Sequence, residues 1–144
     1  IYGQTEPIHI KPYEHHAKYY ETDQMAIVHH TNYIRMFEEA RLDMMEQGGI
    51  PYDAIERMGI IIPVVDVYAK YHSSLKYGDE LEIDIKIKKF NGIRLTYDYQ
   101  VYIKGTGELS ATGYTSHCFL LDGLPVNLKK RFPEVYDKFT EMIK

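Results

Sequence analysis

Polar and hydrophobic residues alternate along several long stretches of the chain. Between positions 81 and 88, Leu and Ile alternate with acids and lysines, and the stretch 93–104 alternates in the same way. A period of two with one apolar face is typical of antiparallel strands. The stretch 60–71 is apolar at its start and alternates later, and 109–121 is a last long strand. The pattern predicts a meander of four long antiparallel strands.

Turn residues separate these strands, and an earlier stretch adds one more. Three hairpin turns are predicted, because Asn and Gly adopt the backbone angles that tight turns need. They lie at Tyr77-Gly78-Asp79, Asn91-Gly92 and Gly105-Thr106-Gly107. Tyr13 to Tyr20 can also alternate, and we predict it as a first strand of a five-stranded sheet.

A helical period begins at Tyr33, where apolar residues recur at spacings of three and four and predict a helix with one buried face. The stripe consists of Tyr33, Met36, Phe37, Ala40 and Met44. Thr31 or Asn32 is the expected N-cap, and Gly48-Gly49 is expected to end the helix. On its charged face we expect an ion pair between Arg35 and Glu39. Short helices are predicted over 52–58 and 133–143, each started by a proline.

These elements predict one α+β domain over residues 1–144, with a helix layer on a sheet layer. One helix of about 15 residues is roughly 22 Å long, which is too little to cover five strands. We therefore expect the C-terminal helix or a second subunit to cover the remaining sheet.

Composition narrows the class of protein. The chain has 144 residues and a net charge of −4, which argues against a nucleic-acid binder. No apolar run approaches the roughly 18 residues of a membrane span, and the N-terminal stretch lacks the apolar core of a signal peptide. Cys118 is the single cysteine, so an internal disulfide is excluded, and we expect a cytoplasmic protein.

One corner combines an acid with a helix start. Asp23 follows the first predicted strand and precedes the long helix, whose first N–H groups and positive dipole end can polarise a bound oxygen. By itself an acid in such a loop is more often a turn-capping residue than a catalytic one.

The residues around this corner resemble the hot-dog-fold acyl-CoA thioesterases of the 4-hydroxybenzoyl-CoA thioesterase type. The resemblance lies in the stretches Tyr20-Glu21-Thr22-Asp23, Val28-His29-His30-Thr31-Asn32-Tyr33, Phe37-Glu38-Glu39-Ala40-Arg41 and 71–81. It implies a five-stranded antiparallel sheet wrapped around a long central helix. It also implies homodimers joined at sheet edges, often paired into homotetramers, with active sites at the subunit interface. Ala26 stands where the family usually has glycine, and His29 where it often has an aromatic residue.

The resemblance assigns catalytic roles to three residues. It implies that Asp23 is the general base or the nucleophile that attacks the thioester, two roles that the sequence does not separate. His30 is implied to stabilise the developing oxyanion through its main-chain N–H, and its ring can also lie near the thioester. Asn32 can orient water or the acyl group, or it can only cap the helix. No metal or redox cofactor is implied.

Further residues are candidates for binding acyl-CoA. Ala26 and Tyr33 are expected at the acyl pocket, and Ser73 and Ser74 along the CoA channel. Cations at the Asn91 turn suit the CoA phosphates, or else they form a solvated strand face. They are Lys88, Lys89 and Arg94.

Other arrangements of the same residue types are less favoured. His15, His16, His29 and His30 do not form a metal-binding motif, because adjacent residues of a strand point to opposite faces. A related hot-dog branch uses a helix glutamate as its acid, but Glu38 and Glu39 lie on the charged face and favour salt bridges. Two other functions stay open, namely a hot-dog hydratase and a non-catalytic module that binds acyl-CoA or acyl carriers.

Overall fold

The computed structural model describes residues 10–23, 28 and 30–143. The strands are β1 (Tyr13–His16), β2 (Ile60–Ile61), β3 (Val64–Tyr71), β4 (Glu80–Phe90), β5 (Arg94–Ile103), β6 (Leu109–Cys118), β7 (Leu120–Leu121) and β8 (Leu124–Pro125). The helices are the 3₁₀ helix η1 (Tyr19–Glu21), α1 (Thr31–Gln47), α2 (Tyr52–Arg57), α3 (Leu128–Arg131) and α4 (Pro133–Glu141). Within the described ranges, no helix is long and apolar enough to cross a membrane.

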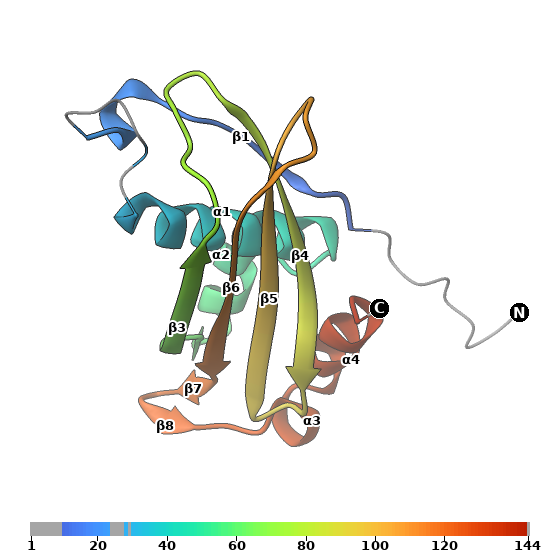
Figure 1. Cartoon of the computed structure of the whole chain (residues 1–144). Coiled ribbons are helices and arrows are strands. Elements are labelled where there is room, and N and C mark those ends of the chain that lie inside the picture. The colour runs from blue at the N-terminus through green and yellow to red at the C-terminus, as the bar shows by residue number, and fades with distance from the viewer. Residues whose placement is uncertain (1–9, 24–27, 29, 144) are drawn as a thin grey trace, which may run out of the picture.

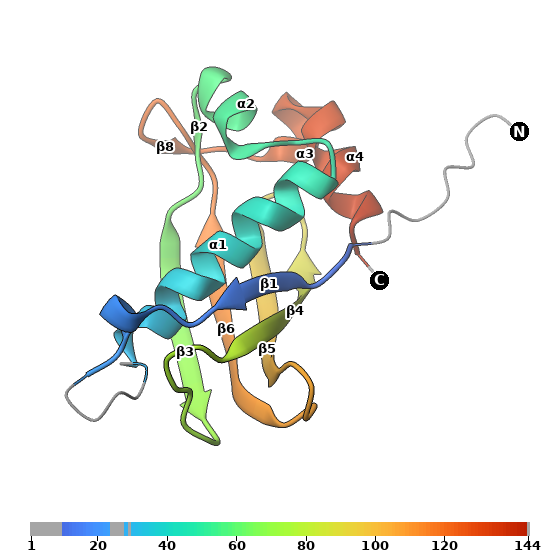
Figure 2. The same ribbon diagram turned by 90° about the horizontal axis from the view of Figure 1, so that it is seen from above.

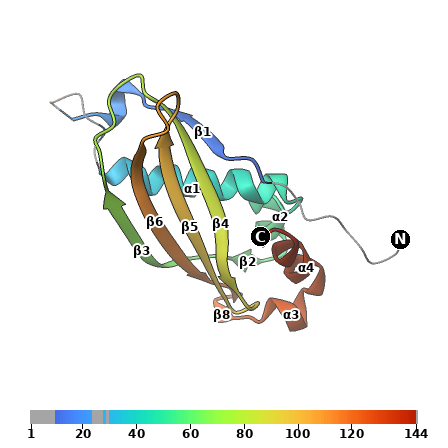
Figure 3. The same cartoon turned by 45° about the vertical axis from the view of Figure 1, so that its right-hand side comes forward.

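Five strands form one antiparallel sheet in the order β1-β4-β5-β6-β3, and α1 lies across one face of it (Figures 1 and 2). The sheet curves around the helix, as Figure 3 shows. The α+β class and the hot-dog arrangement, a long helix wrapped by a five-stranded antiparallel sheet, are therefore confirmed.

The strand order corrects the predicted meander. β4, β5 and β6 are consecutive neighbours, but β3 pairs with β6 and not with β4. The turn at residues 77–79 is therefore not a hairpin. Its chain crosses from one side of the sheet to the other, which leaves β3 at an edge.

Three predicted strands are shorter than expected. The stretch 60–71 divides at Ile62-Pro63, because proline has no N–H for a ladder and ends the pairing. The stretch 109–121 divides after Cys118, and β7 turns away to form a small sheet with β2 and β8. The first strand ends at His16, and the last two residues of the predicted stretch, Tyr19 and Tyr20, belong to the 3₁₀ helix η1. The short helix α3 was not predicted.

The predicted helix stripe forms the centre of the core. All five stripe residues of α1 are buried. The Phe37 ring stacks on Tyr99 with centroids 4.2 Å apart, and Gly113 of β6 lies under the same ring. The C-terminal helix α4 covers the far end of the sheet, where Phe139 packs against Phe90 and Phe119. The expectation that this helix helps to cover the sheet is thus confirmed.

Replacing Gly113 with alanine is expected to lower the free energy of unfolding by about 1–3 kcal/mol, the usual cost of overpacking. A methyl group there would lie 2.5 Å from the Tyr68 carbonyl oxygen and 2.7 Å from Phe37 Cε2. A backbone carbonyl and a stacked ring cannot move aside cheaply.

Gly48→Ala is the matched control for this prediction. A methyl group at Gly48 meets only the flexible side chain of Met142. Urea unfolding should therefore show a smaller loss for Gly48→Ala than for Gly113→Ala. An equal or larger loss at Gly48 would contradict the account of the helix–sheet contact.

Candidate active site

The Asp23 loop is closed at both ends by backbone hydrogen bonds. Thr22 and Val28 form an isolated antiparallel bridge, and the Val28 N–H donates to the Leu75 carbonyl at 2.7 Å. Asp23 follows Thr22 directly and its side chain is exposed. Ala26 and His29, which the sequence singles out, lie outside the described residues.

Asn32 ties this loop to the helix. The predicted N-cap is wrong: α1 begins at Thr31, and His30 is the N-cap residue without a side-chain capping bond. The Asn32 amide instead donates to the Glu21 carbonyl at 2.9 Å. This hydrogen bond fixes the first turn of α1 against the segment that carries Asp23.

A buried carboxylate anchors the other side of the loop. Glu21 is 2% exposed, and both of its carboxylate oxygens lie 3.0 Å from His15 Nε2. Glu21 also accepts the Lys18 N–H at 2.7 Å. This role of Glu21 was not predicted, although His15 falls on the apolar side of β1, where a buried polar residue needs a partner.

Glu39 extends the same network. Its carboxylate accepts the Tyr13 hydroxyl at 2.5 Å and lies 3.4 Å from His15 Nδ1. The expected ion pair of Glu39 with Arg35 is therefore replaced by contacts with β1. Burial, aided by the hydrogen bond to Glu39, raises the pKa of Tyr13 and keeps its hydroxyl a donor. Within the described part of the chain, no group of three His, Cys, Asp or Glu residues is placed to hold a metal ion.

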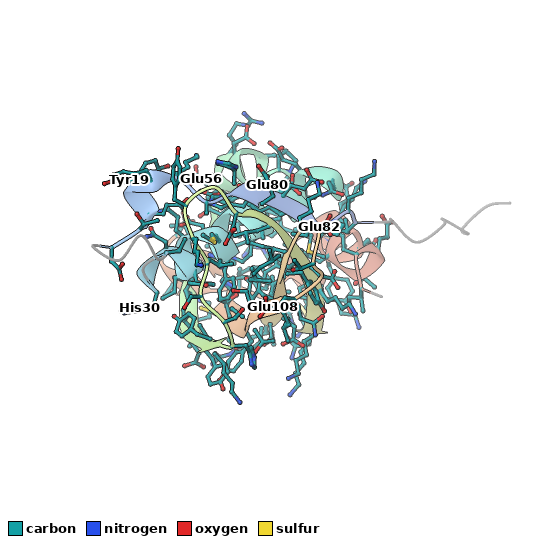
Figure 4. All side chains as sticks on the ribbon, turned by 45° about the horizontal axis from the view of Figure 1, so that its top comes forward. Tyr19, His30, Glu56, Glu80, Glu82 and Glu108 are labelled. Atoms are coloured by element: carbon teal, nitrogen blue, oxygen red, sulfur yellow. The ribbon has the colours of Figure 1, made fainter. Side chains whose placement is uncertain are left out.

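A hollow of about 220 Å³ lies at the start of α1. Its lining brings together four predicted site residues, His30, Tyr33, Ser73 and Ser74, and adds Val28, Tyr71 and His72. The Tyr71 hydroxyl donates to the His30 carbonyl at 3.3 Å, and the Tyr71 and Tyr33 rings are 4.9 Å apart. Burial raises the pKa of both tyrosines, so they stay neutral donors. Figure 4 shows Tyr19 and His30 at the same end of the molecule.

The candidate phosphate-binding residues are not part of this cluster. Lys89, Asn91 and Arg94 lie at the β4–β5 turn, at one end of β4. The Asp23 loop is near the other end of β4, because the chain enters this loop after His16 of β1, and His16 pairs with Glu80. The 11 residues of β4 span about 34 Å at 3.4 Å per residue. Asn91 builds its own turn, since its side-chain oxygen accepts the N–H groups of Ile93 and Arg94.

A second hollow, of about 330 Å³, opens between α1, α2 and the start of β3. Its walls are mainly apolar, formed by Leu42, Met45, Ile61, Ile62, Pro63 and Val64. Arg41 and His117 also line it, and a chain of hydrogen bonds connects them. The Arg41 Nη1 donates to the Tyr99 hydroxyl at 3.1 Å. Thr115 Oγ1 then lies 2.6 Å from the Tyr99 hydroxyl and 2.8 Å from His117 Nε2.

His117 is neutral in the folded protein. Burial, with a smaller contribution from the Arg41 charge, lowers its pKa from 6.5 to about 4. Neither Arg41 nor His117 was predicted as a functional residue, because the hydrogen-bond chain between them depends on the pairing of β5 with β6.

Glu21→Gln is expected to lower the free energy of unfolding by about 1–3 kcal/mol, the cost of leaving a buried donor without its acceptor. Oε1 contacts both the Lys18 N–H and His15 Nε2, whereas Oε2 lies 3.0 Å from His15 Nε2 alone. In the variant an NH₂ group replaces one of these oxygens, so His15 Nε2 loses an acceptor. Chemical denaturation measures the change.

Glu14→Gln serves as the control on the same segment. Glu14 is exposed and pairs with Lys104 at 2.9 Å, and such surface pairs contribute little to stability. Equal effects of the two substitutions would contradict the anchoring role of Glu21.

The buried His117 predicts a dependence of stability on pH. Because its folded pKa lies below its unfolded value of 6.5, the unfolded chain binds the additional proton as the pH falls from 6.5 toward 4. The contribution of the neutral His117 to the free energy of unfolding is therefore complete above pH 6.5 and is lost as the pH falls from 6.5 to 4. By proton linkage the loss between pH 7 and pH 5 is about 1–2 kcal/mol.

The His117→Gln variant isolates this contribution from other acid-sensitive groups. Urea unfolding at pH 7 and pH 5 should show a smaller loss in the variant than in the wild type. The prediction fails if both proteins lose the same stability over this range.

Comparisons with known proteins agree with the fold. The profile of the Thioesterase-like superfamily matches residues 18–139. A DHNA-CoA thioesterase from Staphylococcus aureus has 32% sequence identity and a TM-score of 0.86, with 91% of this chain and 89% of that chain covered. The Bacillus subtilis protein YneP, provisionally named an acyl-CoA thioesterase, is 34% identical over 129 residues, or 88% of this chain and 93% of the relative.

A more distant relative is the 1,4-dihydroxy-2-naphthoyl-CoA hydrolase of Thermosynechococcus vestitus. It is 26% identical over 143 residues, which cover 92% of this chain and 97% of the relative. Since the family profile spans most of the chain and relatives above 30% identity align over nearly their whole length, the chain belongs to the thioesterase-like superfamily of hot-dog proteins.

Proposed function

We propose that the protein hydrolyses an acyl-CoA to a carboxylic acid and CoA, with Asp23 as the attacking group or its base. The observation that carries this proposal is the attachment of the Asp23 segment to the first turn of α1 through the Asn32–Glu21 hydrogen bond. This hydrogen bond ties the segment that carries Asp23 to the helix start, and His30 at that start lines the hollow. The names of several relatives, which refer to acyl-CoA thioester hydrolysis, support the same reaction.

The chemistry follows from these two groups. As a general base, Asp23 takes a proton from water while the water oxygen bonds to the thioester carbonyl carbon. The carbonyl oxygen becomes negative and accepts hydrogen bonds from the first N–H groups of α1, including the proposed donor at His30, next to the positive dipole end. The C–S bond then breaks, and the CoA thiolate leaves and takes up a proton. As a nucleophile, Asp23 would form a mixed anhydride that water cleaves afterwards.

The β3 edge supports a homodimer. Every residue of β3 except Ala69 is exposed, and Val64, Val65 and Val67 are each more than 40% exposed. A long, flat, apolar edge strand pairs readily with a second strand, and a two-fold axis would pair β3 with its own copy in antiparallel orientation. We propose this cytoplasmic dimer as the functional unit, with a homotetramer as a pair of such dimers.

This pairing would also bring the cationic side chains of the β4–β5 turn close to the partner's candidate active site. In the dimer, the Val64 end of β3 in one subunit lies beside the Tyr71 end in the other. The β4–β5 turn is at the Val64 end of the sheet, since Val64 pairs with His117 and Arg94 with Cys118. Lys89, Asn91 and Arg94 are therefore proposed to bind the CoA phosphates at the partner's site. Aromatic acyl-CoAs are the first substrates to test, because two relatives are named for 1,4-dihydroxy-2-naphthoyl-CoA or its abbreviation.

Asp23→Asn is expected to lower kcat/KM by at least about 100-fold, because an amide can neither accept the proton from water nor attack the thioester. The measurement is thiol release from a panel of acyl-CoAs, with the unfolding temperature as a check on folding. Asp137→Asn on the exposed face of α4 is the control and should keep wild-type activity. Full activity of Asp23→Asn would remove the proposed role of this residue.

A further inference from the structure

Arg41 places a positive charge in the second hollow. It is half-buried on α1, and the hollow that it lines is mainly apolar. Across the described ranges, none of the ion pairs involves Arg41. Its side-chain contact is the neutral hydroxyl of Tyr99. A guanidinium carries five N–H donors, so most of the hydrogen-bonding capacity of Arg41 is left for another group.

Glu38 is the carboxylate nearest to Arg41 in sequence among the residues that line this hollow. It lines the same hollow, but it is exposed to solvent and makes no ion pair with Arg41. The Tyr97 ring on the floor of the hollow is fully buried, and burial raises its pKa, so it adds no charge. A ligand with an apolar body and an acceptor oxygen at its inner end would fit these surroundings.

The position of the hollow relates it to the site of a partner subunit. It includes Val64 at the start of β3, whereas the hollow beside His30 includes Tyr71 at the end of β3. Within one chain these ends are about 24 Å apart at 3.4 Å per residue. In an antiparallel pairing of two β3 strands, Val64 of one subunit lies beside Tyr71 of the other. Each Arg41 hollow would then lie next to the His30 hollow of the opposite subunit.

We propose that Arg41 of one subunit binds an acceptor oxygen at the far end of the acyl group whose thioester lies at the helix start of the other subunit. The substrate class is an acyl-CoA with an apolar body and a terminal carboxylate or hydroxyl. This inference rests on the proposed function and names a residue that determines its specificity. Arg41 acts on substrate binding and takes no part in the proton transfer.

The first test compares matched substrates. Adipoyl-CoA and hexanoyl-CoA differ in a terminal carboxylate, and 4-hydroxybenzoyl-CoA and benzoyl-CoA differ in one hydroxyl. The wild type should have the higher kcat/KM for the oxygen-bearing member of at least one pair. Arg41→Met should reduce that preference about 10- to 100-fold, as expected for the loss of a charge-assisted hydrogen bond.

Arg35→Met is the control, since Arg35 is an exposed arginine on the same helix, and the preference should be kept. If Arg41→Met does not fold, Arg41→Lys carries the same comparison, because it keeps the charge and loses the planar fork. The inference is overturned if the wild type shows no preference, or if Arg41→Met lowers both members of a pair equally. Failure to hydrolyse any acyl-CoA would instead remove the proposed function.

The second test asks which subunit supplies Arg41. Asp23→Asn and Arg41→Met chains are co-expressed and assayed with the preferred oxygen-bearing substrate. If Asp23 and Arg41 of a site come from different subunits, a mixed dimer has one site with both native residues and one site with neither. Half of the dimers in a random mixture are mixed, so the mixture should recover about a quarter of wild-type activity. A chain that carries both substitutions, mixed with wild type, controls for dilution. No recovery above the separate variants would show that Asp23 and Arg41 act within one subunit, which contradicts the proposal.

Discussion

The packing of α1 into the curved sheet is the interaction on which the rest of the structure depends. Phe37 can lie flat on Tyr99 because Gly113 leaves room beneath its ring. This contact fixes the axis of the helix and therefore the direction of its first N–H groups. Asn32, on the first turn, then holds the Glu21 segment, and the Asp23 carboxylate follows two residues later. The candidate chemistry is thus positioned by an apolar contact and one side-chain hydrogen bond.

The edge of the sheet sets the second constraint. A single chain leaves β3 exposed along its length, Asp23 exposed and the hollow beside His30 open. The same chain has an apolar hollow with a cation at the opposite end of β3. An antiparallel pairing of two copies would cover the edge and place the two hollows next to each other. One symmetric contact would therefore explain the exposed edge, the unpaired guanidinium and the distance between Asp23 and the cations of the β4–β5 turn.

Local patterns in the sequence predicted the helices and strands better than they predicted which of these elements lie side by side. The stripe from Tyr33 to Met44 and the alternating strands are properties of short segments, so periodicity revealed them. The pairing of β3 with β6 depends on contacts across the whole sheet, and no local pattern records them. Asn32 was expected to cap its own helix, but a partner 11 residues earlier in the chain competes for its amide. The network of His15, Glu21 and Glu39 was missed for the same reason, because it forms only when β1 lies against α1.

The central claim is that one acyl-CoA is held by two copies of the chain. The most direct measurement is a crystal structure with a ketone analogue of adipoyl-CoA, in which a methylene group separates the sulfur from the carbonyl and prevents hydrolysis. The account predicts the ketone oxygen against the first turn of α1 in one subunit, beside Asp23, and the far carboxylate on Arg41 of the other. An analogue held within one subunit, or bound in the hollow on the outer face of the sheet beside Tyr68 and Tyr114, would contradict it.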